Sequence, residues 1–225
     1  MTIQAGLALI FDMDGVILDS NGVHREGWAA YNRRFGIETS EAMHQRMYGK
    51  RNDEIVRDFF GPGLTPDEAA RHGAAKESLF REMMAPRLMA ALVPGVTHFL
   101  QNRNGTPVGL ATNAEPANVD FVLDGVFIGG VPLRNYFRAV IDGHQVTRPK
   151  PDPEVYLRVA ALLGVEPRNC VVFEDSHSGI EAARASGARV VGLRTTHAEF
   201  KNIALAVDDF RDPELEKWLE AQKPR

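Results

Sequence analysis

The chain has 225 residues, 44% of them apolar and 25% charged, a composition typical of globular proteins rather than of disordered, collagen-like or coiled-coil chains. Its 26 basic and 30 acidic residues give a net charge of −4, whereas nucleic-acid-binding proteins are usually basic, so we expect no nucleic-acid partner. No apolar run approaches the roughly 18 residues that span a bilayer, and the single cysteine, Cys170, has no partner for an internal disulfide. We therefore expect a cytoplasmic protein without a membrane partner.

The first predicted element is a buried strand over residues 7–11, a short and continuous apolar run. No convincing strand pattern follows between residues 20 and 92. A helix is predicted over residues 24–35, where aromatic and histidine side chains recur at helical spacing on one face. Two more helices are predicted over residues 52–60 and 66–89. We interpret residues 20–92 as an all-helical insert.

From residue 93 onward, short apolar runs alternate with helical patterns, as in an open α/β sheet. The runs lack polar alternation, which is typical of parallel strands that are covered on both faces. The predicted strands are residues 108–111, 139–141, 170–173, 190–193 and 204–207, and the predicted helices are residues 153–163, 178–186 and 213–219. The sequence thus predicts a Rossmann-like, doubly wound parallel sheet core (residues 1–19 and 93–225) with an inserted helical cap (residues 20–92).

Two pairs of acidic residues stand at the carboxyl ends of predicted strands. Asp12 and Asp14 follow the first strand, and Glu174 and Asp175 follow the strand over residues 170–173. Open α/β sheets bind their ligands at this edge, and clustered carboxylates repel one another unless a cation joins them. Carboxylate oxygens favour Mg²⁺ or Ca²⁺ over zinc, and Mg²⁺ leaves room for phosphate, so the two pairs predict a Mg²⁺-phosphate site.

Two further strand ends carry groups that bind phosphoryl oxygens. Thr112 and Asn113 provide a hydroxyl and an amide after the strand over residues 108–111, and Lys150 provides an ammonium between two stiffening prolines. Taken singly, Thr112 is equally explained as a helix N-cap and Lys150 as a surface lysine. Together, the four strand ends supply nucleophile, donors, cation and acids in chain order, which is a far more specific pattern.

Over nearly the whole chain, these motifs resemble those of the haloacid dehalogenase superfamily of Mg²⁺-dependent phosphotransferases. Asp12-Met13-Asp14-Gly15-Val16 matches the first motif, Thr112 the second, Lys150 the third and Glu174-Asp175 the fourth. The stretches that begin at Lys150 and Glu174 are similar to the subgroup with a helical cap after the first motif. Gly15-Val16 and the downstream His24 are similar to the β-phosphoglucomutase-like branch.

The resemblance implies a covalent mechanism with two catalytic carboxylates. Asp12 would attack phosphorus to form an aspartyl-phosphate, and Asp14 would protonate the leaving oxygen and then deprotonate the hydrolytic water. Mg²⁺ would bind a carboxylate oxygen of Asp12, the backbone carbonyl of Asp14 and the carboxylate of Asp175. Glu174 would be a second acid at the metal, bound directly or through water.

The same resemblance assigns Thr112 and Lys150 to the transferring phosphoryl oxygens, with the amide of Asn113, backbone or side chain, as a further donor. The implied partner is a small-molecule phosphate ester. Sugar phosphates fit the branch best, while nucleotide monophosphates and two-carbon acids stay open. Many compact enzymes of this size work as monomers, and we expect a monomer here.

A mutase differs from a phosphatase because it needs a second pocket that binds phosphate. The β-phosphoglucomutases build that pocket from a basic cap residue and a polar, basic stretch after the second motif. Here that stretch is Ala114-Glu115-Pro116, which offers no side-chain donor and one repelling carboxylate. In the cap loop, Asn52 stands where the mutases carry an arginine, or Arg51 does if the alignment shifts by one residue.

We therefore expect hydrolysis of a small phosphate monoester, with β-phosphoglucomutase activity as the alternative. Lys50, Arg51 and Asn52 are candidate substrate contacts in the cap, although charged runs of this kind usually face water. His24 is a candidate contact with substrate or Asp14 on cap closure, or else a core residue on the same helix face as Trp28.

Two other classes of function fit these residues less well. Dehalogenases of the superfamily need no metal and lack the second aspartate of the first motif, so Asp14 and Glu174-Asp175 argue against that chemistry. A non-catalytic phosphate-binding or regulatory module would normally have lost an acid or the lysine, and this sequence retains all of them.

Overall fold

The computed structural model describes residues 6–103 and 105–222, and its core is one parallel sheet of six strands in the order β5-β2-β1-β6-β7-β8. The strands are β1 (Ala8–Phe11), β2 (Val108–Ala111), β5 (Ala139–Ile141), β6 (Cys170–Glu174), β7 (Arg189–Leu193) and β8 (Leu205–Val207). All six predicted strands are confirmed to within one residue at each end. The chain winds outward from β1 in one direction and from β6 in the other, so the switch point of the sheet lies between these two strands.

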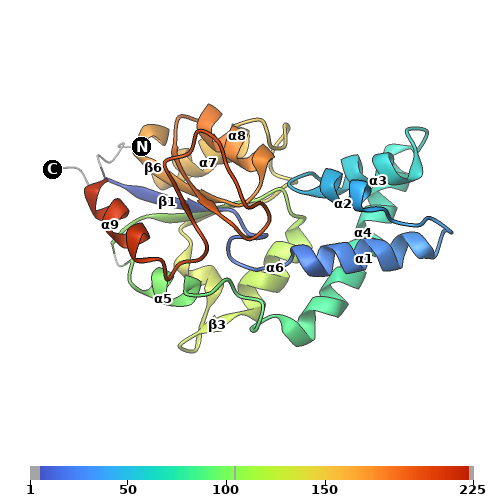
Figure 1. Ribbon diagram of the computed structural model, residues 1–225, viewed down its shortest axis with the longest axis horizontal. Helices are drawn as coiled ribbons and strands as arrows, with labels where there is room; N and C mark the ends of the chain where they lie inside the picture. The colour runs from blue at the N-terminus through green and yellow to red at the C-terminus, as the bar shows by residue number, and fades with distance from the viewer. Residues whose placement is uncertain (1–5, 104, 223–225) are drawn as a thin grey trace.

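Helices cover both faces of this sheet, which confirms the predicted doubly wound fold (Figure 1). Alternate residues of β1 enter opposite layers, with Leu9 and Phe11 in one apolar cluster and Ala8 and Ile10 in the other. The first cluster includes side chains of α5 (Val96–Gln101), α6 (Pro116–Gly125) and α9 (Pro213–Ala221), and the second includes side chains of α7 (Glu154–Leu163) and α8 (His177–Ala185).

The segment between β1 and β2 is helical and lies at one end of the molecule, on the right in Figure 1. It contains α1 (Asn21–Arg33), α2 (Glu41–Met47), α3 (Asn52–Phe60), α4 (Pro66–Met84) and a 3₁₀ turn (Ala85–Arg87). These helices bury an apolar cluster of their own around Trp28, Ile55 and Phe59. The assignment of residues 20–92 as a separate cap domain stays a prediction.

Two chain crossings connect the helical segment to the sheet, and they are hydrogen-bonded to each other. The Asp19 N–H donates to the Ala91 carbonyl at 2.7 Å, and the Val93 N–H donates to the Ile17 carbonyl at 3.0 Å. Leu18 and Leu92 form the antiparallel bridge between these bonds. The helical segment is therefore joined to the core through one paired, two-stranded connection.

The helix predicted over residues 66–89 ends earlier than expected. Pro86 lacks the N–H that a continuing α-helix requires, so α4 ends at Met84 and the chain tightens into the 3₁₀ turn. The sequence pattern places the N-cap of α7 at Asp152, but the helix begins one residue later and its N-cap is Pro153. Asp152 still contacts the helix start, because its Oδ1 accepts from the Glu154 N–H at 3.0 Å. Elements that the sequence analysis missed are α2, α5, α6, the hairpin of β3 (Phe127–Ile128) and β4 (Val131–Pro132), and two short 3₁₀ turns (Leu133–Tyr136 and Pro167–Asn169).

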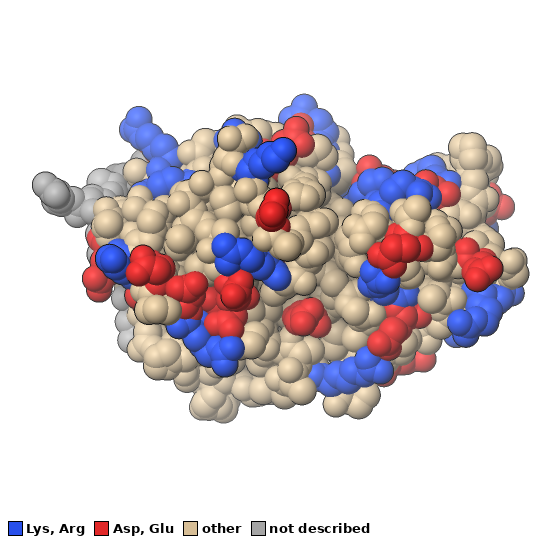
Figure 2. Space-filling view, viewed as in Figure 1, with Lys and Arg blue, Asp and Glu red and all other residues tan. Residues whose placement is uncertain are grey.

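The surface carries both signs of charge. On the face shown in Figure 2, Lys and Arg side chains are interspersed with Asp and Glu side chains over both the sheet core and the helical segment. Within the described residues, no helix combines the length and apolar character needed to cross a membrane.

Phe173 tests how strongly the aromatic cluster beneath the site stabilises the core. The side chain is fully buried and stacks on Phe11 with a ring-centroid distance of 4.6 Å. We expect Phe173→Ala to lower the free energy of unfolding by roughly 3–5 kcal/mol, as measured by urea denaturation. The matched control is Phe35→Ala at a side chain that is 52% exposed, where we expect a loss of less than about 1 kcal/mol. Equal losses would contradict this account of the core.

Candidate active site

The carboxyl ends of four neighbouring strands meet at one edge of the sheet, and the side chains expected there lie together. Asp12 follows β1, Thr112 follows β2, Lys150 follows β5 in the chain, and Glu174 ends β6. Helices α1, α3 and α4 close over this edge and contribute further side chains to a cavity between the sheet and the helical segment. The parallel strand order brings residues more than 150 positions apart to a single pocket.

Lys150 lies at the centre of the polar groups on the sheet side. Its Nζ donates to Asp12 Oδ1 at 2.6 Å, to Glu174 Oε1 at 2.7 Å and to the Ala111 carbonyl at 3.1 Å. Burial alone lowers the pKa of this ammonium, but the two carboxylates outweigh burial and raise the pKa above its usual value. Lys150 is therefore a permanently charged group beside the Asp12 carboxylate.

Glu174 is saturated with hydrogen bonds from the protein itself. Its Oε1 accepts from Lys150 and from the Tyr156 hydroxyl, and its Oε2 accepts from the Ser176 hydroxyl and from the backbone N–H groups of Asp175 and Ser176. A Cβ on Gly179 would lie 1.7 Å from Glu174 Oε1, so only glycine leaves room for this carboxylate. This geometry supports a positioning role toward Lys150, and direct contact of Glu174 with a metal stays a prediction.

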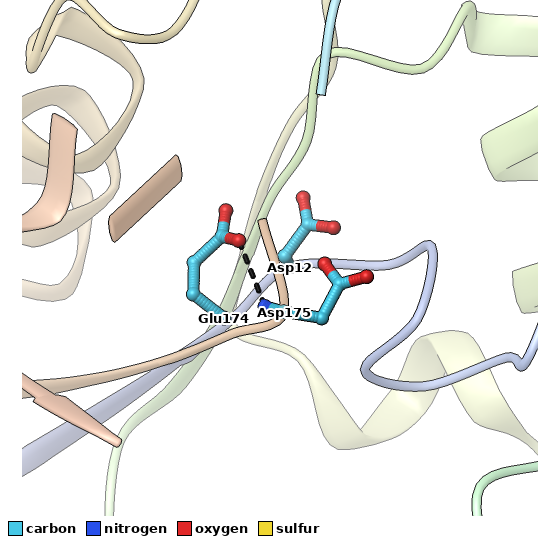
Figure 3. A group of neighbouring side chains, drawn as sticks. All are labelled: Asp12, Glu174 and Asp175. Atoms are coloured by element: carbon cyan, nitrogen blue, oxygen red, sulfur yellow. Dashed lines mark hydrogen bonds between the residues drawn. The ribbon is translucent and has the colours of Figure 1, made fainter. Parts of the chain in front are cut away.

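Asp12, Glu174 and Asp175 form a buried group whose ligand oxygens lie within 4.8 Å of one another (Figure 3). Burial raises the pKa of Asp12 to about 7, with Lys150 opposing the shift, and burial beside Glu174 and Asp12 raises the pKa of Asp175 well above its usual value. Three carboxylates face one ammonium, so negative charge is in excess. Hard oxygen donors with this excess charge fit a divalent cation such as Mg²⁺.

The Asp175 carboxylate is held from the opposite side by Asn21 of α1. Asn21 Nδ2 donates to Asp175 Oδ2 at 3.2 Å, and the Thr196 hydroxyl donates to the same oxygen. Gly15 passes directly beside it with a φ of +75°, and a Cβ there would lie 1.9 Å from Asp175 Oδ2. Sequence analysis did not identify Asn21 or Thr196, because neither belongs to a strand-end motif.

Asp14 lies next to the helical segment rather than among the other acids. Its Oδ1 accepts from the Ser20 hydroxyl at 2.6 Å and lies 3.3 Å from His24 Nε2. Burial raises the pKa of Asp14, but the contacts with His24 and Ser20 outweigh burial and lower the pKa below its usual value. The contact expected between His24 and Asp14 is therefore present, and it favours the ionised form of Asp14.

His24 continues into a buried chain of polar groups that the sequence analysis missed. Lys76 Nζ lies 2.7 Å from His24 Nδ1 and donates to Glu77 Oε1 at 2.8 Å, and Asn118 of α6 donates to Glu77 Oε2 at 2.7 Å. Both Lys76 and Glu77 are buried on α4 beside Phe80. The signal available in the sequence was the pair of charged residues Lys76 and Glu77 on the apolar stripe of an amphipathic helix. Charged side chains are almost never buried without partners, so such a pair indicates a buried polar contact.

Thr112 and Asn113 occupy the expected strand end in two different ways. Thr112 is buried, lines the cavity and accepts from the Ala114 N–H at 3.0 Å, which leaves its hydroxyl hydrogen free to donate to a ligand. The Asn113 side chain instead donates to the Gly49 carbonyl at 2.8 Å and accepts from the Lys150 N–H at 3.3 Å. The Asn113 side chain thus joins the cap loop to the core. Because that side chain is occupied, the backbone N–H of Asn113 is its remaining candidate donor to phosphate.

The three candidate cap contacts differ in position. Lys50 and Asn52 line the cavity, whereas Arg51 does not line it and has its guanidinium Nε 3.6 Å from Asp53 Oδ1. Asn52 Nδ2 also donates to Glu115 Oε1 at 2.7 Å, which connects α3 to the loop after β2. The geometry thus favours Lys50 and Asn52 over Arg51 as substrate contacts.

Glu77 provides a pH-dependent test of this buried chain. Burial raises its pKa, but Lys76, His24 and Asn118 outweigh burial and lower the pKa to about 2. A lowered carboxyl pKa adds stability above the unfolded-state value of 4.5, and that stability is lost as the pH falls toward about 2. We expect the free energy of unfolding in urea to fall more steeply between about pH 5 and pH 3 for the wild type than for Glu77→Gln. Parallel pH profiles would contradict this; Glu181→Gln, at an exposed site, is the control and should follow the wild type.

Comparison with known proteins identifies the family to which this chain belongs. A family model described as haloacid dehalogenase-like hydrolase matches residues 7–187. Protein CbbY of Rhodobacter capsulatus is 31% identical over 219 residues, covering 92% of this chain and 93% of the relative. The fructose-1-phosphate phosphatase YqaB of Escherichia coli (strain K12) is 32% identical over 189 residues, which cover 83% of this chain and 95% of the relative. The crystal structure of β-phosphoglucomutase from Clostridium difficile shares the fold, with a TM-score of 0.83, 24% identity and 96% coverage of both chains. The resemblance inferred from the motifs is confirmed, and the chain belongs to the haloacid dehalogenase-like hydrolases.

Proposed function

We propose that this hydrolase is a Mg²⁺-dependent phosphatase that releases phosphate from a small sugar phosphate through an aspartyl-phosphate on Asp12. The observation that carries the proposal is the arrangement of two carboxylates with different surroundings. Asp12 lies against the Lys150 ammonium at 2.6 Å, whereas Asp14 lies against the Ser20 hydroxyl and His24. The similarity to a fructose-1-phosphate phosphatase supports the sugar phosphate as substrate class.

The geometry supports a sequence of two displacements at phosphorus. In the first, an Asp12 oxygen bonds to phosphorus and the leaving alcohol oxygen departs with a proton from Asp14, which enters this step in its acid form although the contact with His24 favours its ionised form. In the second, Asp14 takes a proton from water, the water oxygen bonds to phosphorus, and the bond to Asp12 breaks to release inorganic phosphate. Lys150 and the Thr112 hydroxyl stabilise the charge on the phosphoryl oxygens in both steps.

Mg²⁺ would be held by the carboxylates of Asp12 and Asp175 and the backbone carbonyl of Asp14, with Glu174 in support. Bound there, it would neutralise the acidic group and polarise the phosphoryl group. Asn21 and Thr196 keep the Asp175 carboxylate in place. Lys150 keeps the Asp12 carboxylate oriented toward the cavity.

Hydrolysis is favoured over a mutase reaction by the groups near the loop after β2. Glu115 places a carboxylate beside Asn52, where a second phosphate of a bisphosphate would need positive charge. Lys50 lines the cavity and is the group on which the mutase alternative rests. A non-catalytic module is disfavoured because all four motifs lie together with their acids and lysine intact.

Asp12→Asn tests the assigned nucleophile. An amide is far less nucleophilic than a carboxylate, so we expect Mg²⁺-supported turnover of p-nitrophenyl phosphate to fall at least roughly 10³-fold. EDTA should abolish wild-type turnover, and added Mg²⁺ should restore it. Asp208→Asn, at a side chain that is 81% exposed, is the matched control and should retain wild-type activity. Turnover that survives Asp12→Asn would show the mechanism to be wrong.

The identity of the product separates a phosphatase from a mutase. We expect inorganic phosphate to appear from one preferred member of a panel of sugar and nucleotide monophosphates in the presence of Mg²⁺. With β-glucose 1-phosphate and a bisphosphate primer, we expect no glucose 6-phosphate beyond the rate of phosphate release. Faster formation of glucose 6-phosphate would establish the mutase alternative and assign the second phosphate site to Lys50 or Arg51.

A further inference from the structure

We infer that Glu115 is a positioning residue that orients the Asn52 amide, and that this pair selects a leaving group carrying a hydroxyl and disfavours one carrying a second phosphate. The inference rests on the proposed phosphatase activity and names the substrate class that the same site accepts. It assigns specificity to the contact between α3 of the helical segment and the loop after β2.

The pair joins the helical segment to the loop that follows β2. Asn52 is the first residue of α3 and lines the cavity, and its Nδ2 donates to Glu115 Oε1 at 2.7 Å. Glu115 immediately precedes α6 but makes no side-chain hydrogen bond to the amino end of that helix. Its carboxylate is instead directed to the helical segment, 63 positions earlier in the chain.

The chemistry of the two groups determines which atom of Asn52 is left for a ligand. An ionised carboxylate only accepts hydrogen bonds, so the NH₂ group of Asn52 must face Glu115. The amide oxygen is then left as an acceptor, and a hydroxyl is the group on a sugar that donates to it. A phosphate dianion has no hydrogen to donate, and the negative charge of Glu115 repels it.

Gly73 of α4 provides separate evidence that the fold accommodates this pair. A Cβ at Gly73 would lie 3.1 Å from Asn52 Cβ, closer than side chains normally pack, and 3.4 Å from Glu115 Oε1, at the limit of ordinary van der Waals contact. Glycine within a helix is less favourable than alanine by roughly 1 kcal/mol. The space needed by the Asn52–Glu115 contact gives a physical reason for glycine at this position.

The buried cation on α4 does not offset the negative charge of Glu115. Lys76 lines the same cavity, but its ammonium is already neutralised by Glu77 at 2.8 Å and contacts His24 at 2.7 Å. Beside Asn52, a second phosphate would therefore meet an acceptor oxygen and the Glu115 carboxylate, and Lys50 is the cap-loop cation that would oppose this repulsion. A neutral polyol meets groups that match its hydroxyls.

The test measures competitive inhibition of p-nitrophenyl phosphate hydrolysis by three ligands. Fructose 1-phosphate carries hydroxyls, fructose 1,6-bisphosphate adds a second phosphate, and butyl phosphate lacks hydroxyls. For the wild type, we expect fructose 1-phosphate to inhibit with a Ki at least about tenfold lower than that of either other ligand. Similar Ki values for all three ligands, or no inhibition by any of them, would overturn the inference.

Variants then test whether Glu115 acts through Asn52. Glutamine both donates and accepts, so Glu115→Gln removes the charge and frees the Asn52 amide to rotate. We expect Glu115→Gln and Asn52→Ala each to lower the ratio of the Ki for bisphosphate to that for monophosphate about tenfold, and the double variant to lower it no further. Additive effects, or an unchanged ratio in Glu115→Gln, would refute the positioning role.

Two controls separate failure of this inference from failure of the proposed function. Glu181→Gln removes a charge from an exposed site on α8 and should leave all three Ki values unchanged. If the wild type does not hydrolyse p-nitrophenyl phosphate with Mg²⁺, the proposed phosphatase activity is itself wrong. If it does hydrolyse this substrate but the Ki ratio does not respond to Glu115→Gln, the specificity inference alone is wrong.

Discussion

The buried ammonium of Lys150 is the interaction on which the rest of the site depends. It lies between Asp12 and Glu174, two carboxylates from strands that are adjacent in space and far apart in sequence. A buried charge group of this kind contributes little to stability by itself, because desolvation offsets most of the Coulombic attraction. Its presence in the core is better explained by the proposed role of Asp12 as nucleophile, which needs a cation beside it.

Glu174 shows how such an arrangement is kept rigid. Its donors come from three local features, which are the Lys150 ammonium, a tyrosine on α7, and the two residues that precede α8. The Ser176 hydroxyl caps α8 by accepting from the Gly179 N–H and also donates to Glu174, and Gly179 leaves the space that the Glu174 carboxylate occupies. The two residues of the fourth motif thus differ in their contacts. Glu174 binds the lysine, and Asp175 belongs to the buried acidic group that fits a cation.

The helical segment completes the site through polar contacts that are partly or fully buried. His24 meets Asp14, Asn21 meets Asp175, Asn113 meets the Gly49 carbonyl, and Glu77 meets Asn118 across the boundary with the core. Such contacts are directional, so a small change in the position of the helices breaks several at once. This arrangement suits a site that must exclude water from one step and admit it to the next.

Much of the fold and the sheet side of the site followed from the sequence, because strands and helix starts are encoded by neighbouring residues. Unbroken apolar runs ending in Asp12, Thr112 and Glu174 identified strands and their functional ends together. Parallel pairing brings such ends to one edge, so that part of the site was predictable.

The short helices α2 and α5 were not predicted, because six or seven residues carry too little periodicity. The sequence alone determined that the candidate phosphate-binding groups stand at the ends of strands. Only the tertiary structure decided that Lys76 is neutralised by Glu77 and that Glu115 orients Asn52, because those pairings depend on how helices pack across the cavity.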